Sequence, residues 1–356
     1  SSHLRARNHS CTTIGQNYHL SMAIPTVHIA RIAADVATDV APTSLRAAGS
    51  IAALAARAAA SSSSSSNFWQ NGCFGISLQD NGSQVAPLPP WDSVRNIFDA
   101  ASRVRSRGLD STLEPPSRSE RRLWRGLISP PRAEHRGHQR EDWKQTLDLT
   151  SEALQSDRLA RRVGADFRQV QNFFQNAADL VGLLEAHLQQ RQQQLGLPTN
   201  HLTMHRMHRL LDYDDALRTP TNTASSYSKE EWCQPHFDYG SFTLIWADST
   251  GLQVQAPGSY RIESEEAWLP APPDADLMVI VGKALSFVSS GELSAPLHRV
   301  VLPSDGRHCA GRRRSSIALF VEPSKDTLLQ CSDSRSEPIK YSDFKKSLRS
   351  QAYGSE

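Results

Sequence analysis

HFDYGSFTLIWAD, residues 236–248, is the stretch that decides the fold. Its second part, SFTLIWA, is rich in aromatic, β-branched and other apolar residues, which is the composition of a buried strand. Its first part places His236 and Asp238 two residues apart, so an extended backbone projects both side chains from the same face. The stretch therefore predicts a strand-rich core with a polar pair on one face.

Short segments of the same kind surround this stretch, separated by clusters of Pro, Gly and Ser. They are MHRLLDY (207–213), GLQVQ (251–255), DLMVIV (276–281), LHRVVL (297–302) and SSIALFV (315–321), with GCFGISL (72–78) upstream. Many short strands at this spacing predict a sandwich or a barrel. No motif repeats at a fixed period, which excludes solenoids and propellers.

Helices are expected on both sides of the strands. The apolar residues of the longest one recur at steps of three and four: Phe167, Val170, Phe174, Ala177, Val181, Leu184 and Leu188. Gly196 and Pro198 end this run. An Ala-rich helix is expected at 44–60, followed by a flexible run of serines at 61–66, and a final helix at 341–353. The expected fold class is α+β, with a mainly β core and a helical N-terminal half packed against it.

A second histidine, His298, follows in LHRVV on a later strand. Two imidazoles and one carboxylate on one side of a metal form the facial triad typical of non-haem iron(II), which leaves adjacent coordination positions open. We therefore take His236, Asp238 and His298 as candidate ligands of Fe(II). Each histidine taken alone is equally consistent with a hydrogen-bonded residue of the β-region.

Arg314 and Ser316 lie two residues apart in RSSIALFVEP and share one strand face. A guanidinium beside a hydroxyl can hold a carboxylate through two charge-assisted hydrogen bonds and a third bond from the hydroxyl. The alternative is that Arg314 is a surface residue of the RRR run at 312–314. Because Ile317, Leu319 and Val321 assign the opposite face to the core, the remaining face carries Arg314, Ser316 and Ala318.

These motifs, in this order and spacing, resemble the 2-oxoglutarate and iron(II)-dependent dioxygenases of the isopenicillin N synthase-like group. The resemblance is carried by HFDYGSFTLIWAD, TGLQV, WLPAPP, LHRVV and RSSIALFVEP, and it is specific over 205–323. Weaker likenesses lie upstream at IPTVHIA (24–30), RGLI (125–128), DWKQTLDL (142–149) and LGLP (195–198). The resemblance implies a double-stranded β-helix, or jelly roll.

The same resemblance implies the roles of six residues. His236, Asp238 and His298 hold iron, and Arg314 and Ser316 bind the distal carboxylate of 2-oxoglutarate. Tyr213 falls where the family usually has a tyrosine that touches the same carboxylate. Two positions depart from the family pattern: Leu211 stands where asparagine is usual, and Lys283 stands where aspartate commonly follows the glycine.

The implied activity is the oxidation of a small organic substrate, by hydroxylation, desaturation or ring closure, coupled to decarboxylation of 2-oxoglutarate to succinate and CO2, with O2 as oxidant. Two alternatives stay open. One is an oxidase like isopenicillin N synthase, which does not use 2-oxoglutarate; Leu211 keeps this alternative open, and Arg314 and Ser316 do not exclude it. The other is a non-catalytic relative of the same fold that acts as a binding protein, for which the Ser- and Arg-rich insertions of the N-terminal half argue.

The expected regions are a disordered or targeting segment at 1–22, the N-terminal helical region at 23–198, the jelly-roll Fe(II)/2-oxoglutarate domain at 199–323, and a C-terminal tail and helix at 324–356. Three histidines at 201, 205 and 208 could imitate a metal site on one helical face, but they lead directly into the strand that ends at Tyr213.

Composition excludes several partners. The 356 residues carry a formal net charge of +2, which gives no global field for nucleic acid, and the mean hydropathy of −0.47 fits a soluble, non-membrane protein. Five scattered cysteines without a CxxC pair fit reduced thiols. We expect a cytoplasmic monomer that binds a small molecule; an organellar location is the alternative, because the N-terminus is rich in Ser, Ala and Arg.

Overall fold

The computed structural model describes residues 24–33, 68–106, 142–194, 204–214, 231–256, 267–301, 313–332 and 337–351, apart from 25, 30–31, 81–82, 85, 143, 158–159 and 162–163. The segment 1–22, the helix expected at 44–60 and the serines at 61–66 lie outside these residues. RGLI and LGLP lie outside them as well.

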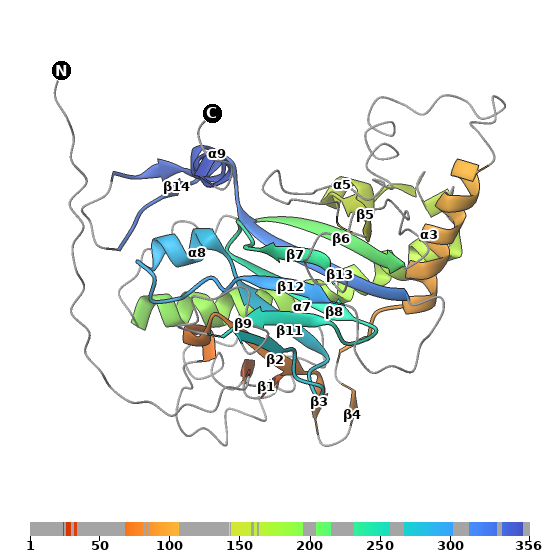
Figure 1. Ribbon diagram of the computed structural model, residues 1–356, viewed down its shortest axis with the longest axis horizontal. Coiled ribbons are helices and arrows are strands. Elements are labelled where there is room, and N and C mark those ends of the chain that lie inside the picture. Colours follow the sequence, from red (N-terminus) through yellow and green to blue (C-terminus); the bar gives the residue numbers. More distant parts are fainter. Residues whose placement is uncertain are drawn as a thin grey trace, which may run out of the picture.

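Within the described residues, seven strands form a major sheet in the order β1-β2-β11-β8-β13-β6-β5 (Figure 1). They span Thr26–His28 (β1), Cys73–Ser77 (β2), Leu277–Val281 (β11), Phe242–Ala247 (β8), Arg313–Pro323 (β13), Met204–Asp214 (β6) and Lys144–Leu149 (β5). All neighbours are antiparallel except β1 and β2, which are parallel.

Four more strands form a minor sheet in the order β10-β9-β12-β7 in the described part of the chain. They span Trp268–Pro270 (β10), Leu252–Gln255 (β9), His298–Val301 (β12) and Glu231–His236 (β7). Two hairpin-like pairs complete the strands: β3 (Gln79–Asp80) with β4 (Ser83–Gln84), and β14 (Leu328–Leu329) with β15 (Ile339–Lys340). The strands expected from the sequence at 72–78 and between 207 and 321 are all confirmed.

The two sheets face each other across an apolar layer, as is typical of a double-stranded β-helix. This inner cluster takes Leu211, Tyr213 and Ala318 from the major sheet and Trp232 and Val254 from the minor one. Strand alternation assigns the opposite, outer face of the major sheet to a second cluster. The architecture is a mixed α/β fold with a β core.

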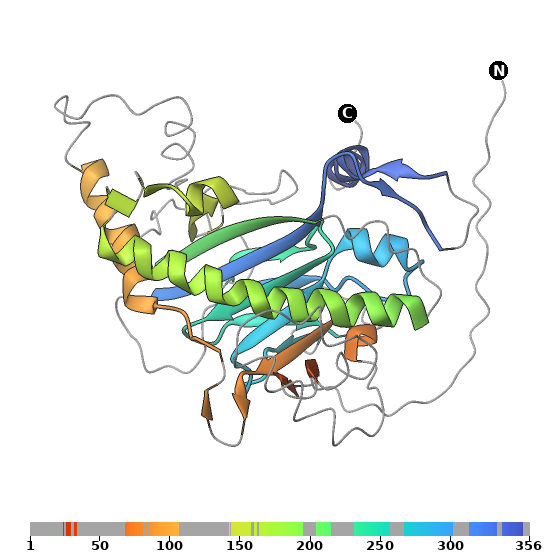
Figure 2. The same ribbon diagram turned by 180° about the vertical axis from the view of Figure 1, so that it is seen from behind.

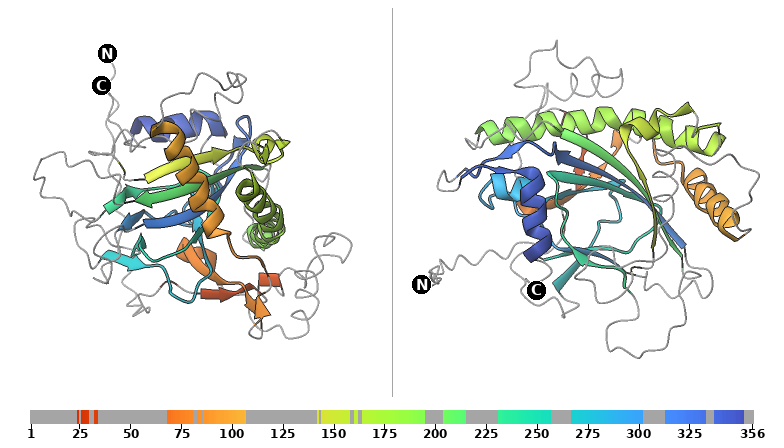
Figure 3. Two further views of the ribbon diagram at one scale, coloured as in Figure 1. Left: turned by 90° about the vertical axis from the view of Figure 1, so that its right-hand side faces the viewer. Right: turned by 90° about the horizontal axis from the view of Figure 1, so that it is seen from above.

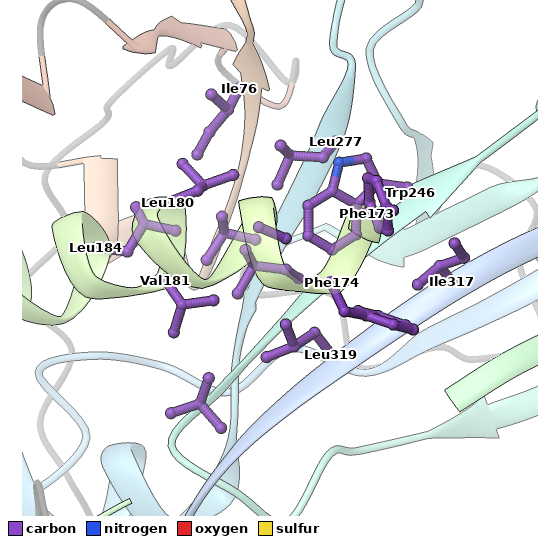
Figure 4. Close-up of a cluster of buried hydrophobic side chains, with 14 of the residues drawn as sticks. Ile76, Phe173, Phe174, Leu180, Val181, Leu184, Trp246, Leu277, Ile317 and Leu319 are labelled. Carbon is purple, nitrogen blue, oxygen red and sulfur yellow. The ribbon is translucent and has the colours of Figure 1, made fainter. Parts of the chain in front are cut away.

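The outer face is covered by the long helix α7, Ala165–Gln194. Figure 4 shows Phe173, Phe174, Leu180, Val181 and Leu184 of this helix in a cluster with buried side chains of the sheet, which include Ile76 of β2, Trp246 of β8, Leu277 of β11, and Ile317 and Leu319 of β13. The expected helix is therefore confirmed, and so is the expected division of β13, because Ile317, Leu319 and Val321 lie in the outer cluster while Ala318 lies in the inner one.

The other helices lie at the ends of the sheets. Helix α3 (Trp91–Ser106) lies near the first residue of β13, and α9 (Tyr341–Gln351) lies at its far end (Figures 2 and 3). The shorter elements are the 3-10 helix η2 (Phe68–Asn71), α5 (Ser151–Leu154) and α8 (Lys283–Val288). No helix in the described stretches combines the length and apolar character needed to cross a bilayer.

Candidate metal and cosubstrate site

Two neighbouring strands of the minor sheet bring the two candidate histidines together. β12 pairs with β7 so that His298 lies opposite His236, with ring centroids 4.2 Å apart. Asp238 follows His236 by two residues, just after β7 ends. The two side chains lie on the same side of the backbone, since their ligand atoms are close together. Sequence positions 62 residues apart thus meet on one side of the sheet.

The three side chains form a compact set of metal-ligating atoms. One ligand atom from each of His236, Asp238 and His298 lies within 4.8 Å of the others. The His298 Nε2 lies 3.8 Å from the Asp238 Oδ2, and both residues are buried. Two imidazole nitrogens and one carboxylate oxygen are a donor set that suits Fe(II). Among the described residues this is the only group of three such side chains.

Neighbouring groups orient each of the three. The Nδ1 of His236 lies 2.9 Å from the carbonyl oxygen of Gln234, and the Nδ1 of His298 lies 3.4 Å from that of Pro296. A carbonyl can only accept, so Nδ1 carries the hydrogen and Nε2 keeps a lone pair for a metal. The Thr243 hydroxyl donates to the Asp238 Oδ2 at 2.6 Å. These hydrogen bonds thus orient the donor atoms of all three side chains.

Backbone hydrogen bonds hold the turn that carries Asp238. The amide of Lys283 donates to the carbonyl of Asp238 at 2.8 Å, and the amide of Ala284 donates to that of Gly240 at 3.0 Å. The turn also packs against glycine backbone: a Cβ added at Gly282 would lie 2.2 Å from the Gly240 carbonyl oxygen. We call residues 238–241 the clamped turn. Only glycine permits this close approach between the turn and the start of α8.

Arg314 lies deep between the sheets and is 1% exposed. Its Nε donates to the carbonyl of Thr250 at 3.0 Å, whereas Nη1 and Nη2 have no hydrogen-bond partner among the described residues. Burial lowers the pKa of Arg314, and the nearby Tyr213 and Asp248 act in the opposite direction. A buried guanidinium with two unused NH2 groups fits a carboxylate that binds both at once. The alternative of a surface arginine is therefore wrong.

Ser316 and Tyr213 flank Arg314 on the inner face. Ser316 is two residues further along β13 and is 2% exposed. Tyr213 lies opposite Arg314 in the pairing of β6 with β13, and its ring centroid is 5.3 Å from the Arg314 Cζ. Leu211 lies opposite Ser316 and belongs to the same inner cluster as Tyr213. The structure thus brings together the three residues expected at the cosubstrate carboxylate, beside an apolar neighbour.

Two side chains that support this region, one aromatic and one charged, were not predicted from the sequence. Trp232 stacks on Tyr213 with ring centroids 5.7 Å apart and an interplanar angle of 12°. Lys144, on β5, lies opposite Tyr213 and is 5% exposed. The sequence contained a signal for Lys144, because Leu147 and Leu149 assign the other face of that strand to the outer core.

The histidines at 201, 205 and 208 do not form a metal site on a helix. His201 and the side chain of His205 lie outside the described residues, and β6 is extended from Met204 to Asp214. His208 is buried on the outer face, 4.4 Å from the ring of Phe174. Lys283 is the first residue of α8, and its Nζ lies 3.7 Å from the centroid of the Phe237 ring.

Comparison with known proteins links this geometry to one superfamily. Residues 206–323 match the model of the 2OG-Fe(II) oxygenase superfamily. A 2-oxoglutarate-dependent dioxygenase, ecdG of Aspergillus rugulosus, is 33% identical over 113 residues, which cover 31% of this chain and 30% of that protein. The 1-aminocyclopropane-1-carboxylate oxidase 1 of Oryza sativa subsp. japonica is 28% identical over 179 residues, or 46% and 47% of the two chains.

A solved structure extends the likeness to the whole fold. A full-length protein of Neurospora crassa, solved in complex with alpha-KG (2-oxoglutarate), has a TM-score of 0.54, with 18% identity over 93% of this chain and 96% of that one. At this identity the likeness concerns the fold alone. The matches to the two curated relatives span less than half of each relative's own length. Residues 206–323, which hold all six candidate site residues, belong to the 2OG-Fe(II) oxygenase superfamily.

Proposed function

We propose that this chain is an oxygenase that uses Fe(II), 2-oxoglutarate and O2 to oxidise a small organic molecule. The observation that carries the proposal is the joint presence of an oriented two-histidine, one-carboxylate set and a buried guanidinium with two unused NH2 groups. The first fits iron, and the second fits the distal carboxylate of a keto acid. The name of the matched relative ecdG, a 2-oxoglutarate-dependent dioxygenase, and the superfamily model that residues 206–323 match agree with this assignment.

Each residue has a distinct task in this proposal. His236, Asp238 and His298 would hold the metal, whose chemistry would be that of non-haem iron(II). Arg314 binds the distal carboxylate of 2-oxoglutarate, and Ser316 and Tyr213 add hydrogen bonds to it. Once bound, iron with 2-oxoglutarate supplies oxidising power from O2 through decarboxylation of the keto acid to succinate and CO2. The apolar inner cluster excludes water from the reacting groups.

The experiment is an anaerobic titration of metal-free protein with Fe(II), followed by 2-oxoglutarate. We expect one Fe(II) per chain, a visible charge-transfer band on adding 2-oxoglutarate, and succinate once air is admitted. His236→Ala removes one of three ligands and abolishes iron binding and turnover. His208→Gln is the matched control, because His208 lies on the outer face of the major sheet and leaves iron stoichiometry unchanged.

The same titration decides between the alternatives. Iron binding without the visible band and without succinate would replace the proposal with an oxidase that does not use 2-oxoglutarate, the alternative that Leu211 keeps open. Failure to bind iron at all would leave a non-catalytic binding protein. Wild-type iron stoichiometry in the His236→Ala protein would remove that histidine from the site.

We also propose the domain organisation drawn from the sequence: a disordered or targeting segment at 1–22, a helical region at 23–198 that packs against the core, the jelly-roll domain at 199–323, and the C-terminal tail and helix at 324–356. The positions of α3 and α7 support a helical covering of the β core. Limited proteolysis with mass mapping tests these boundaries. The cytoplasmic or organellar location and the monomeric state stay predictions, which cell fractionation and light scattering test.

A further inference from the structure

A lysine of the major sheet and a cysteine of the minor sheet are in contact in the space between the two sheets. The Nζ of Lys144, on β5 of the major sheet, donates to the Sγ of Cys233, on β7 of the minor sheet, at 2.9 Å. Lys144 is 5% exposed and Cys233 is 1% exposed. Buried lysine is rare unless it is paired, and here the Asp142 carboxylate lies 3.6 Å away and is itself fully buried. Burial and the neighbouring carboxylate therefore hold the amine and the thiol in contact.

This contact adjoins the candidate site on both sides. The Sγ of Cys233 lies 3.8 Å from the Nδ1 of His236. On the major sheet, Lys144 lies opposite Tyr213, and Tyr213 lies opposite Arg314, so the three form one row across β5, β6 and β13. The thiol thus adjoins a group proposed to hold the metal, and the amine adjoins a group proposed to hold the cosubstrate.

The chemistry open to such a pair is oxidative cross-linking. Thiol sulfur is oxidised first to a sulfenic acid; direct condensation of this acid with a nitrogen gives an S–N bond, whereas a second two-electron oxidation that joins the nitrogen to the sulfenic oxygen gives an N–O–S bridge. The nitrogen at contact distance here is the Lys144 Nζ, and its separation of 2.9 Å from the Cys233 Sγ is longer than an S–N bond, so an inserted oxygen atom spans the two with less movement of the strands. A second buried thiol in the same inner cluster, Cys73, offers a contrast: its strand β2 lies near the opposite edge of the major sheet from β5, so Lys144 is not its neighbour. Cys73 is expected to stay inert.

We propose that Lys144 and Cys233 form a reversible covalent redox switch, in which one oxygen atom is inserted between Nζ and Sγ to give an N–O–S bridge. With O2 as oxidant, the ammonium and the thiol react as Lys–NH3⁺ + Cys–SH + O2 → Lys–NH–O–S–Cys + H2O + H⁺. Nitrogen and sulfur together lose four electrons, and the two oxygen atoms gain them. Two equivalents of hydrogen peroxide give the same bridge with three molecules of water.

The bridge has a defined consequence for the site. It removes the ammonium charge of Lys144 from the row that contains Arg314, and it ties β5 to β7 across the two sheets. We expect the oxidised protein to bind 2-oxoglutarate several-fold more weakly than the reduced protein, because one cation near the anion is lost. This consequence rests on the proposed function, whereas formation of the bridge does not.

The test uses the full-length, metal-free chain, so that it is independent of catalysis. The protein is treated with air or dilute hydrogen peroxide, and its intact mass and cross-linked peptides are measured. We expect a gain of about 14 Da, one oxygen added and two hydrogens lost, in a species that joins the segments around 144 and 233 and that dithiothreitol reverses. Cys233→Ser abolishes it, and Cys73→Ser, the matched control, leaves it intact.

Other outcomes would overturn the proposal. They are a gain of about 16 or 32 Da on Cys233 alone, a loss of about 2 Da from a direct S–N bond, or a gain that survives in Cys233→Ser or resists the reductant. The regulatory part has its own readout: the dissociation constant of 2-oxoglutarate, measured in the iron-loaded protein before oxidation, after it and after reduction. An unchanged constant would overturn that part, and iron loading without any response to 2-oxoglutarate would instead contradict the proposed function.

Discussion

The guanidinium of Arg314 is buried away from water. Two of its nitrogen atoms donate to no group among the described residues. An unsatisfied charged group in the interior is costly, so the side chain is poised for a ligand that supplies both missing acceptors. The neighbouring Arg313 is different. It pairs with Asp212 at 2.7 Å and with Asp99 at 2.8 Å, on the other face of the strand. The two adjacent arginines therefore have different roles: Arg313 forms ion pairs within the protein, and Arg314 can bind a ligand.

Arg314→Lys is predicted to raise the Michaelis constant for 2-oxoglutarate by one to two orders of magnitude. An ammonium cannot match the planar two-point contact with a carboxylate, and the loss corresponds to ~1.5–3 kcal/mol for a charged hydrogen bond. Ser316→Ala should cost less. Steady-state kinetics of succinate formation give the measurement. Arg313→Lys is the control, and an unchanged constant in the Arg314→Lys protein would remove this role from Arg314.

Tyr213→Phe is predicted to weaken 2-oxoglutarate binding by roughly 0.5–1.5 kcal/mol, the net value of one hydrogen bond, or somewhat more because the acceptor is charged. Iron binding should not change. Tyr213 is 2% exposed, which excludes a ring whose hydroxyl simply stands in bulk water. Calorimetric titration with 2-oxoglutarate under anaerobic conditions measures the effect. Equal affinity in the two proteins would make Tyr213 a packing residue only.

At the scale of elements, the contact between α7 and the outer face of the major sheet includes a buried titratable group, His208. Its ring lies against Phe174 of α7, and it is 6% exposed. Burial lowers the pKa of His208 from 6.5 to about 4, although a hydrogen bond with the Leu149 backbone acts to raise it. A neutral imidazole therefore packs under the helix, and a charged one does not fit there.

The pH dependence of folding follows from this shift. Below about pH 6.5 the unfolded chain takes up a proton at His208 that the folded chain refuses until about pH 4, so stability falls as the pH decreases across that window. The contribution is about 2 kcal/mol between pH 7 and pH 5. Urea unfolding of wild-type and His208→Gln proteins at both pH values measures it. Parallel pH profiles of the two proteins would contradict the assignment.

The elements were the part of the molecule that the sequence predicted best. Strands such as 315–321 and the long helix have periodic apolar residues, and this periodicity can be recognised within a short window of the sequence. The inner-face partners could not be predicted in the same way. That Lys144, Tyr213 and Arg314 form one row depends on the register of three strands that are far apart in sequence, and no local pattern encodes that register.

At the scale of the whole molecule, the candidate site joins the two sheets. The metal-ligating set belongs to the minor sheet and the turn after it, whereas Arg314, Ser316 and Tyr213 belong to the major sheet. A keto acid that spans both groups therefore adds a link between the sheets that the unfolded chain does not have. Binding and folding are coupled as a result.

Iron(II) with 2-oxoglutarate is accordingly predicted to raise the melting temperature. At a concentration 100-fold above the dissociation constant the added stability is about 2.7 kcal/mol, and chelation of the metal should remove it. Anaerobic scanning calorimetry measures the shift with and without chelator. The Arg314→Lys protein should respond to iron but gain little from 2-oxoglutarate; a full response to both would show that the two groups are not linked through this residue.

The clamped turn bears on exchange of backbone hydrogens with solvent. The amides of Lys283 and Ala284 donate to the carbonyls of Asp238 and Gly240, and that of Ser241 donates to Val321, so the carboxylate ligand is held by main-chain bonds on both sides. In deuterated water these three amides should exchange slowly, and equally slowly with or without iron, since the turn is already in its final shape. The metal would then bind at little cost in chain entropy.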